Sequence, residues 1–106
     1  MPDDIQLSSH VREIFEQYGV KRQYHAGEVL QAKGTLSAQA GFLVKGQLRT
    51  FCLGPSGDEI SLFYLGPGNL FGSNALIDHP KVMVSVAAIS PAEAYLLSAD
   101  RFWTHW

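Results

Sequence analysis

The sequence predicts a mainly β domain, an antiparallel jelly roll or small barrel with a helix at each end. Short apolar and β-branched runs recur along residues 20–98, and each ends at the Gly or Pro that a tight reversal requires. Apolar residues at helical spacing occur near the two ends instead. With 106 residues, 46% of them hydrophobic, and a single cysteine, Cys52, the chain suits one domain that folds without disulfides.

The first helix is predicted from the segment SSHVREIFEQYG. Ser8 or Ser9 is expected as its N-cap, with Glu13 placed for a capping box. Four apolar residues at helical spacing form a stripe that should dock on the rest of the domain: Val11, Ile14, Phe15 and Tyr18. Gly19 follows the stripe and should end the helix.

The strands expected after this helix are short. Two extended pieces flank Ala26-Gly27, and further strands are expected at 42–45, 47–53, 59–64 and 82–89, with one more after Ser90-Pro91. Within 59–64 the side chains alternate with the period of a pleated surface: Ile60, Leu62 and Tyr64 against Ser61 and Phe63. At the end of the sequence, Ser98 is the expected N-cap of a second helix, with Asp100 in its first turn.

Charge and hydropathy exclude several classes of function for these residues. The net charge is −2, from 8 basic and 10 acidic residues, without the basic stripe that phosphate neutralisation needs. The first ten residues, MPDDIQLSSH, carry acids where a signal peptide would be positive. No apolar run approaches the roughly 20 residues of a membrane span. We therefore expect a cytoplasmic protein without membrane contact.

Metal and catalytic sites are not indicated. The four histidines form no closely spaced pair, and an iron–sulfur cluster needs about four cysteines. No G-x-S-x-G elbow supports Ser–His–Asp catalysis. We expect no enzyme, no catalytic residue and no metal, while haem held by a single axial ligand stays open, with His79 as the first candidate.

The order GEVL, FLVKGQLR, PSGDEISLFYLGPGNLFG and SPAEAYLLSADRFW, within residues 20–106, resembles the effector domain of the Crp-Fnr superfamily of bacterial transcription regulators. The glycines that carry much of this resemblance are Gly27, Gly46, Gly57, Gly68 and Gly72. The resemblance implies an antiparallel double-stranded β-helix of the cyclic-nucleotide-binding type. After the helical segment predicted at 1–19, it implies the β-roll effector domain at 20–98 and the start of a dimerisation helix at 99–106.

In that family the dimerisation helix makes a homodimer, and a helix-turn-helix domain, absent from this sequence, binds DNA. The apolar residues near the end, Phe102, Trp103 and Trp106, fit a helix that continues into a dimer interface. The alternative is a segment that folds back on its own barrel. A freestanding cyclic-nucleotide-like module that only mediates protein contacts also stays open.

The stretch GPGNLFGSNALIDHPKVMVSV, residues 66–86, contains what we call the cassette loop, residues 71–86. In nucleotide-binding members the matching loop holds the cyclic phosphate through backbone N–H groups, a glutamate after the glycine and an arginine on the returning strand. Here Ser73 stands in place of the glutamate, and Val82 and Met83 lie around the arginine position. Lys81, the nearest cation, lacks the guanidinium fork. We therefore expect a retained pocket that does not bind cyclic AMP.

The expected effector is a small, fairly apolar organic molecule, an aromatic one being an option, oriented by one or two hydrogen bonds. The expected effector-binding residues are Phe63, Tyr64, Gly72, Ser73, Asn74, Val82, Met83 and Ser85. Within the superfamily, the segments FLVKGQLR, SLFYLGPG and SADRFW are most similar to the halorespiration branch, whose members sense chlorinated aromatics.

Overall fold

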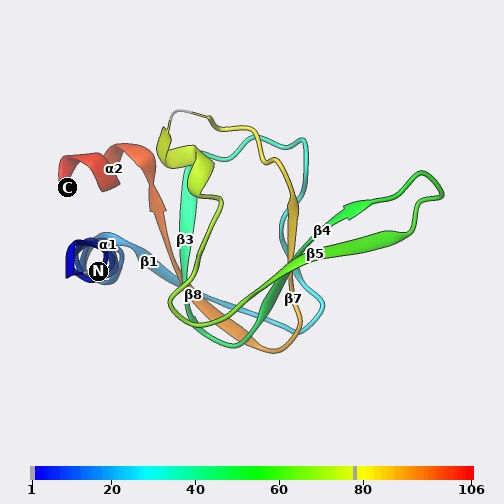
Figure 1. The fold of residues 1–106 in the computed structure, drawn as a ribbon, viewed down its shortest axis with the longest axis horizontal. Helices are drawn as coiled ribbons and strands as arrows, with labels where there is room; N and C mark the ends of the chain where they lie inside the picture. Colours follow the sequence, from blue (N-terminus) through cyan, green and yellow to red (C-terminus); the bar gives the residue numbers. More distant parts are fainter. Residues whose placement is uncertain (1, 78) are drawn as a thin grey trace.

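The computed structural model describes the backbone of residues 2–77 and 79–106 and the side chains of residues 9–77 and 79–106. Eight short strands form two antiparallel sheets, with a helix at either end of the chain (Figure 1). The elements are α1 (Pro2–Tyr18), β1 (Val20–Tyr24), β2 (Val29–Gln31), β3 (Gln39–Lys45), β4 (Leu48–Leu53), β5 (Glu59–Leu65), β6 (Leu70–Phe71), η1 (Ser73–Ile77), β7 (Ser85–Ala88), β8 (Ala92–Ser98) and α2 (Ala99–Thr104).

The two sheets have the strand orders β1-β8-β3-β6 and β2-β7-β4-β5. Because the chain crosses repeatedly from one sheet to the other, strands distant in sequence pair with each other, as β1 does with β8. This arrangement confirms the predicted antiparallel roll. Figure 1 shows that β4 and β5 continue as a hairpin well beyond the body of the roll.

Two groups of buried side chains form the core. One lies between the sheets and includes Leu43, Leu48 and Val86. The other fastens both helices to the roll, and Phe15 is fully buried at its centre. The Phe15 ring centroid lies 5.9 Å from that of Phe42 on β3 and 5.9 Å from that of Phe102 on α2. The predicted docking stripe of α1 is thus confirmed.

Several predicted boundaries were wrong, among them the start of β3, which lies at Gln39 rather than Phe42. Helix α1 begins at Pro2, so Ser8 and Ser9 lie inside it rather than at its N-cap. The strand expected over 82–89 is shorter, because the residues before β7 bond to another loop. Gly34 N–H donates to Val82 O at 2.9 Å, and Val82 N–H donates to Thr35 O at 2.9 Å.

Helix α2 has the expected N-cap, since Ser98 Oγ accepts a hydrogen bond from Arg101 N–H at 3.3 Å. The segment then packs against α1, where the Tyr18 and His105 rings stack with centroids 3.5 Å apart. Phe102 is buried, whereas Trp103 and Trp106 are 51% and 47% exposed. The alternative in which this segment folds back on its own barrel therefore accounts for Phe102, but it leaves about half of each tryptophan side chain exposed. Across the described residues, no helix combines the length and apolarity that crossing a membrane requires.

Candidate functional site

The cassette loop leaves β6 through Gly72, which adopts a left-handed backbone conformation with φ of 64°. A Cβ at this position would lie 2.6 Å from Nε2 and 2.7 Å from Oε1 of Gln31. The side-chain amide of Gln31 therefore covers the glycine closely. The backbone conformation favours glycine at position 72, whereas the contact is with the end of a flexible side chain that can move aside.

After Gly72 the loop forms η1 and is closed by the side chain of Asn74. Its Nδ2 donates to the carbonyl oxygen of His79 at 2.8 Å and to that of Lys81 at 2.6 Å. These two bonds join the start of the loop to its return. Asn74 thus fixes the shape of the loop, and its amide nitrogen is already used there.

A cavity of about 210 Å³, which we call the cassette cavity, lies between this loop and the inner faces of β4, β5 and β7. It is lined by Gln31, Thr50, Phe63, Leu65, Leu70, Phe71, Gly72, Ser73, Asn74, Val82, Met83, Val84 and Val86. Six of the eight expected effector-binding residues are in this set: Phe63, Gly72, Ser73, Asn74, Val82 and Met83. Among the described residues that line it, none is charged.

Tyr64 and Ser85 do not line the cassette cavity, contrary to expectation. Successive residues of a strand face opposite sides, so a cavity that Phe63 lines does not include Tyr64. Ser85 likewise precedes the buried Val86, and its Oγ accepts a hydrogen bond from Lys33 N–H at 2.9 Å.

The sequence reasoning also missed several lining residues, of which Gln31 and Thr50 are polar. Thr50 is 7% exposed and lies opposite Val86 in the β4–β7 pairing. Its Oγ1 accepts a hydrogen bond from Phe63 N–H at 3.0 Å, next to a bulge in the β4–β5 ladder. Alternation along β4 could have indicated Thr50. No local pattern marks Gln31.

Arg49, a cation on β4, does not reach the cassette cavity. The Arg49 guanidinium hydrogen-bonds to Glu59 and, at 3.3 Å, to Ser61 Oγ, and it covers the Phe51 ring at 4.4 Å. Arg49 is thus held on the face of β4 away from the cassette cavity. His79, the haem-ligand alternative, is absent from the described lining of this cavity as well.

Helix α2 borders the same region. An apolar hollow of about 480 Å³ shares Leu70, Ser73, Asn74 and Met83 with the cassette cavity and extends to Phe102, Trp103 and Trp106. The indole N–H of Trp103 donates to the carbonyl oxygen of Leu76 in η1 at 2.6 Å. This bond connects the cassette loop directly to α2.

Replacing Trp103 with phenylalanine keeps an aromatic ring but removes the donor to Leu76. We expect the free energy of unfolding to fall by about 0.5–1.5 kcal/mol, the usual contribution of one hydrogen bond. Amide exchange in η1 should accelerate more than exchange in β3, measured by hydrogen–deuterium exchange. Trp106→Phe is the matched control, and equal acceleration in η1 by both variants would contradict a specific role for Trp103.

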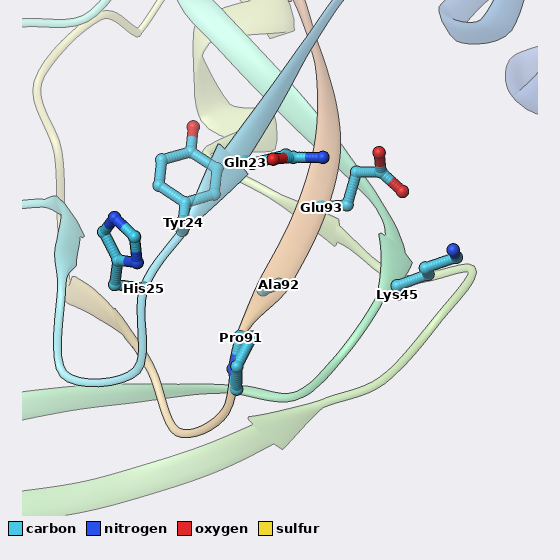
Figure 2. Close-up of a pocket in the computed structure, with 7 residues that line it drawn as sticks. All are labelled: Gln23, Tyr24, His25, Lys45, Pro91, Ala92 and Glu93. Atoms are coloured by element: carbon cyan, nitrogen blue, oxygen red, sulfur yellow. The ribbon is translucent and has the colours of Figure 1, made fainter.

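A larger hollow of about 560 Å³ lies beside the ends of β1 and β3 and the start of β8 (Figure 2). Figure 2 shows Glu93 and Lys45 pointing away from Tyr24 and His25, so the polar groups that line this hollow do not converge. Burial raises the pKa of Glu93. Hydrogen bonds from Lys21 and Gln23 and the charges of Lys21 and Lys45 lower it by more, so this pKa lies below its ordinary value. Glu93 is therefore a charged partner of Lys21, 3.3 Å away, and the hollow is a poor candidate site.

Comparison with known proteins decides the family. The family described as the cyclic nucleotide-binding domain matches residues 21–104. The chain belongs to this family. Among curated proteins, the cyclic AMP receptor protein of Thermus thermophilus is 31% identical over 85 residues, which are 80% of this chain and 39% of that protein.

Solved structures agree with this membership. The catabolite activator protein of Thermus thermophilus superposes on this cyclic nucleotide-binding domain with a TM-score of 0.80 and 27% identity, covering 92% of this chain and 45% of that one. A cyclic nucleotide-binding-like protein from Brucella abortus gives a TM-score of 0.78 at 22% identity, covering 90% and 81%. The chain spans about two fifths of the curated relative's length. These matches support a domain related to Crp and lend no support to the halorespiration branch.

Proposed function

We propose that this chain is the effector-sensing domain of a Crp-Fnr-type transcription regulator and that its effector is an uncharged small molecule rather than cyclic AMP. The observation that carries the proposal is the lining of the cassette cavity, in which no described residue is charged. A cyclic phosphate buried there would lose its hydration without an ionic partner. Hydrogen bonds to charged groups contribute about 1.5–3 kcal/mol each, so the missing contacts would weaken binding severely.

The size and chemistry of the cavity indicate the class of effector. At about 210 Å³ it is smaller than the roughly 300–1,000 Å³ of typical ligand pockets. Phe63 and Phe71 supply aromatic walls, while Gln31 and Ser73 supply polar atoms. A compact aromatic molecule with one hydrogen-bonding group fits this lining. A chlorinated aromatic, as sensed in the halorespiration branch, is one such molecule.

The contacts of the cassette loop supply a mechanism for a switch. An effector in contact with Ser73 would contact the start of η1. This element is connected to α2 by the hydrogen bond from Trp103 to the carbonyl oxygen of Leu76. In the proposed regulator, residues 99–106 begin the helix through which two subunits associate, and a helix-turn-helix domain of the whole protein reads DNA in the cytoplasm. We propose that this helix has two arrangements in equilibrium. The effector shifts that equilibrium only if it binds the two arrangements with different affinity.

Thermal unfolding with cyclic AMP, cyclic GMP, haem and a panel of chlorinated phenols tests the proposal. A ligand at about a hundred times its dissociation constant adds roughly 2.7 kcal/mol of stability, which a melting curve resolves. We expect a phenol to raise the melting temperature and cyclic AMP to leave it unchanged. The double variant Ser73→Glu with Met83→Arg restores the missing charged groups, and we expect it to gain cyclic AMP binding. Micromolar binding of cyclic AMP to the unmodified protein would overturn the proposal.

A further inference from the structure

A further concavity, larger than the three hollows described above, lies outside the cassette cavity. This outer groove, of about 790 Å³, is bounded by the loop at 32–34, the end of β4 and the returning limb of the cassette loop at 79–85. Figure 1 shows β4 leaving the body of the roll beside β7, the strand that the returning limb enters. Its volume lies within the range of small-molecule sites.

Positive charge gathers in this groove although the chain as a whole has a net charge of −2. Lys33 and Lys81 line it, together with His79, and none of its described lining residues is acidic. The ion pairs seen among the described side chains use other cations: Arg12, Lys21, Arg22 and Arg49. The groove therefore offers two ammonium groups to an anion.

The groove also has an apolar wall. Leu53 and Met83 line it and are 65% and 53% exposed. Its two lysine-bearing segments are held together by the Gly34–Val82 and Val82–Thr35 hydrogen bonds and by that from Lys33 N–H to Ser85 Oγ. Because these bonds already fix the backbone around both lysines, a ligand need not order the loops, which limits the entropy cost of binding.

We propose that the outer groove binds a small amphipathic organic anion, such as an aromatic carboxylate or sulfonate. The anionic group pairs with Lys33 and Lys81, and the apolar body lies on Leu53 and Met83. The charged part of this site is distinct from the proposed effector site, since neither lysine is among the described residues that line the cassette cavity, whereas Val82 and Met83 line both hollows.

The test uses 1-anilinonaphthalene-8-sulfonate, a fluorescent amphipathic anion, and its uncharged analogue N-phenyl-1-naphthylamine. We expect the sulfonate to bind the unmodified protein, and Lys33→Gln with Lys81→Gln to raise its dissociation constant at least tenfold. Lys45→Gln, which removes a lysine outside the groove, should leave that constant unchanged. Binding of the uncharged analogue should be the same in all three proteins.

The position of the bound sulfonate is tested independently through Cys52, which is the only cysteine in the sequence and lines the groove. We expect the sulfonate to slow alkylation of Cys52 by iodoacetamide in the unmodified protein but not in the double lysine variant. An unchanged alkylation rate, or equal sulfonate affinity for the unmodified protein and the double variant, would overturn the proposal. The predictions for cyclic AMP and the phenols depend on neither lysine, so they stand in either case.

Discussion

Replacing Phe15 with alanine is expected to lower the free energy of unfolding by about 3–5 kcal/mol, the usual cost of emptying a buried phenylalanine site. Phe15 has no exposed surface and lies between the rings of Phe42 and Phe102. Its removal would leave a cavity where α1, β3 and α2 meet, and the rigid sheet cannot close it. Chemical denaturation monitored by circular dichroism measures the loss.

The matched control is Phe63→Ala, the same change at a side chain that is 68% exposed. We expect this variant to change the free energy of unfolding by less than about 0.5 kcal/mol, as exposed substitutions usually do. A loss for Phe15→Ala as small as that expected for Phe63→Ala would show that α1 is not fastened to the roll through Phe15.

Replacing Gly46 with alanine is expected to lower the free energy of unfolding by about 2–5 kcal/mol. Gly46 forms the reversal between β3 and β4 with φ of 88°, a conformation that costs an L-residue about 1–2 kcal/mol. The added Cβ would also collide with the backbone oxygen of Pro91 and lie 2.9 Å from Cα of Ala92. Such overpacking adds about 1–3 kcal/mol, because β8 would have to shift.

Gly57→Ala separates these two effects. Gly57 has nearly the same φ, 84°, but a Cβ there meets no atom within 4 Å. We expect it to cost only the conformational part, about 1–2 kcal/mol. Thermal and urea unfolding of both variants measure the difference, and equal losses would mean that the contact with Pro91 is relieved at little cost.

Much of the roll follows from local signals in the sequence. Glycines and prolines mark the reversals, as at Gly46, and β-branched and aromatic runs mark the strands between them. The start of α1 was misplaced because the apolar stripe that marks its docked face begins only at Val11. Pro2, followed by acidic residues, is itself a typical start signal and was the better guide.

The site was harder to predict because its lining depends on which face each strand turns inward. Phe63 and Tyr64 are neighbours in sequence, so the pleat allows only one of them to face the cavity. Gln31 follows an irregularity in the pairing of β2 with β7, between Val29 and Gln31. A bulge of this kind changes the facing of the residues after it, and alternation along the sequence cannot show that.

The projecting hairpin of β4 and β5 exposes a strand edge to other protein chains. Strand β5 is the last strand of its sheet, and its apolar side chains Ile60, Leu62, Phe63 and Tyr64 are 46%, 41%, 68% and 70% exposed. An exposed edge of this composition is a template on which a foreign strand can pair. The register shift between Thr50 and Phe51, which leaves Leu62 of β5 without a partner on β4, interrupts the regular spacing that such pairing needs. This irregularity, beside which Thr50 Oγ1 accepts a hydrogen bond from Phe63 N–H, therefore makes β5 a poorer template for a foreign strand.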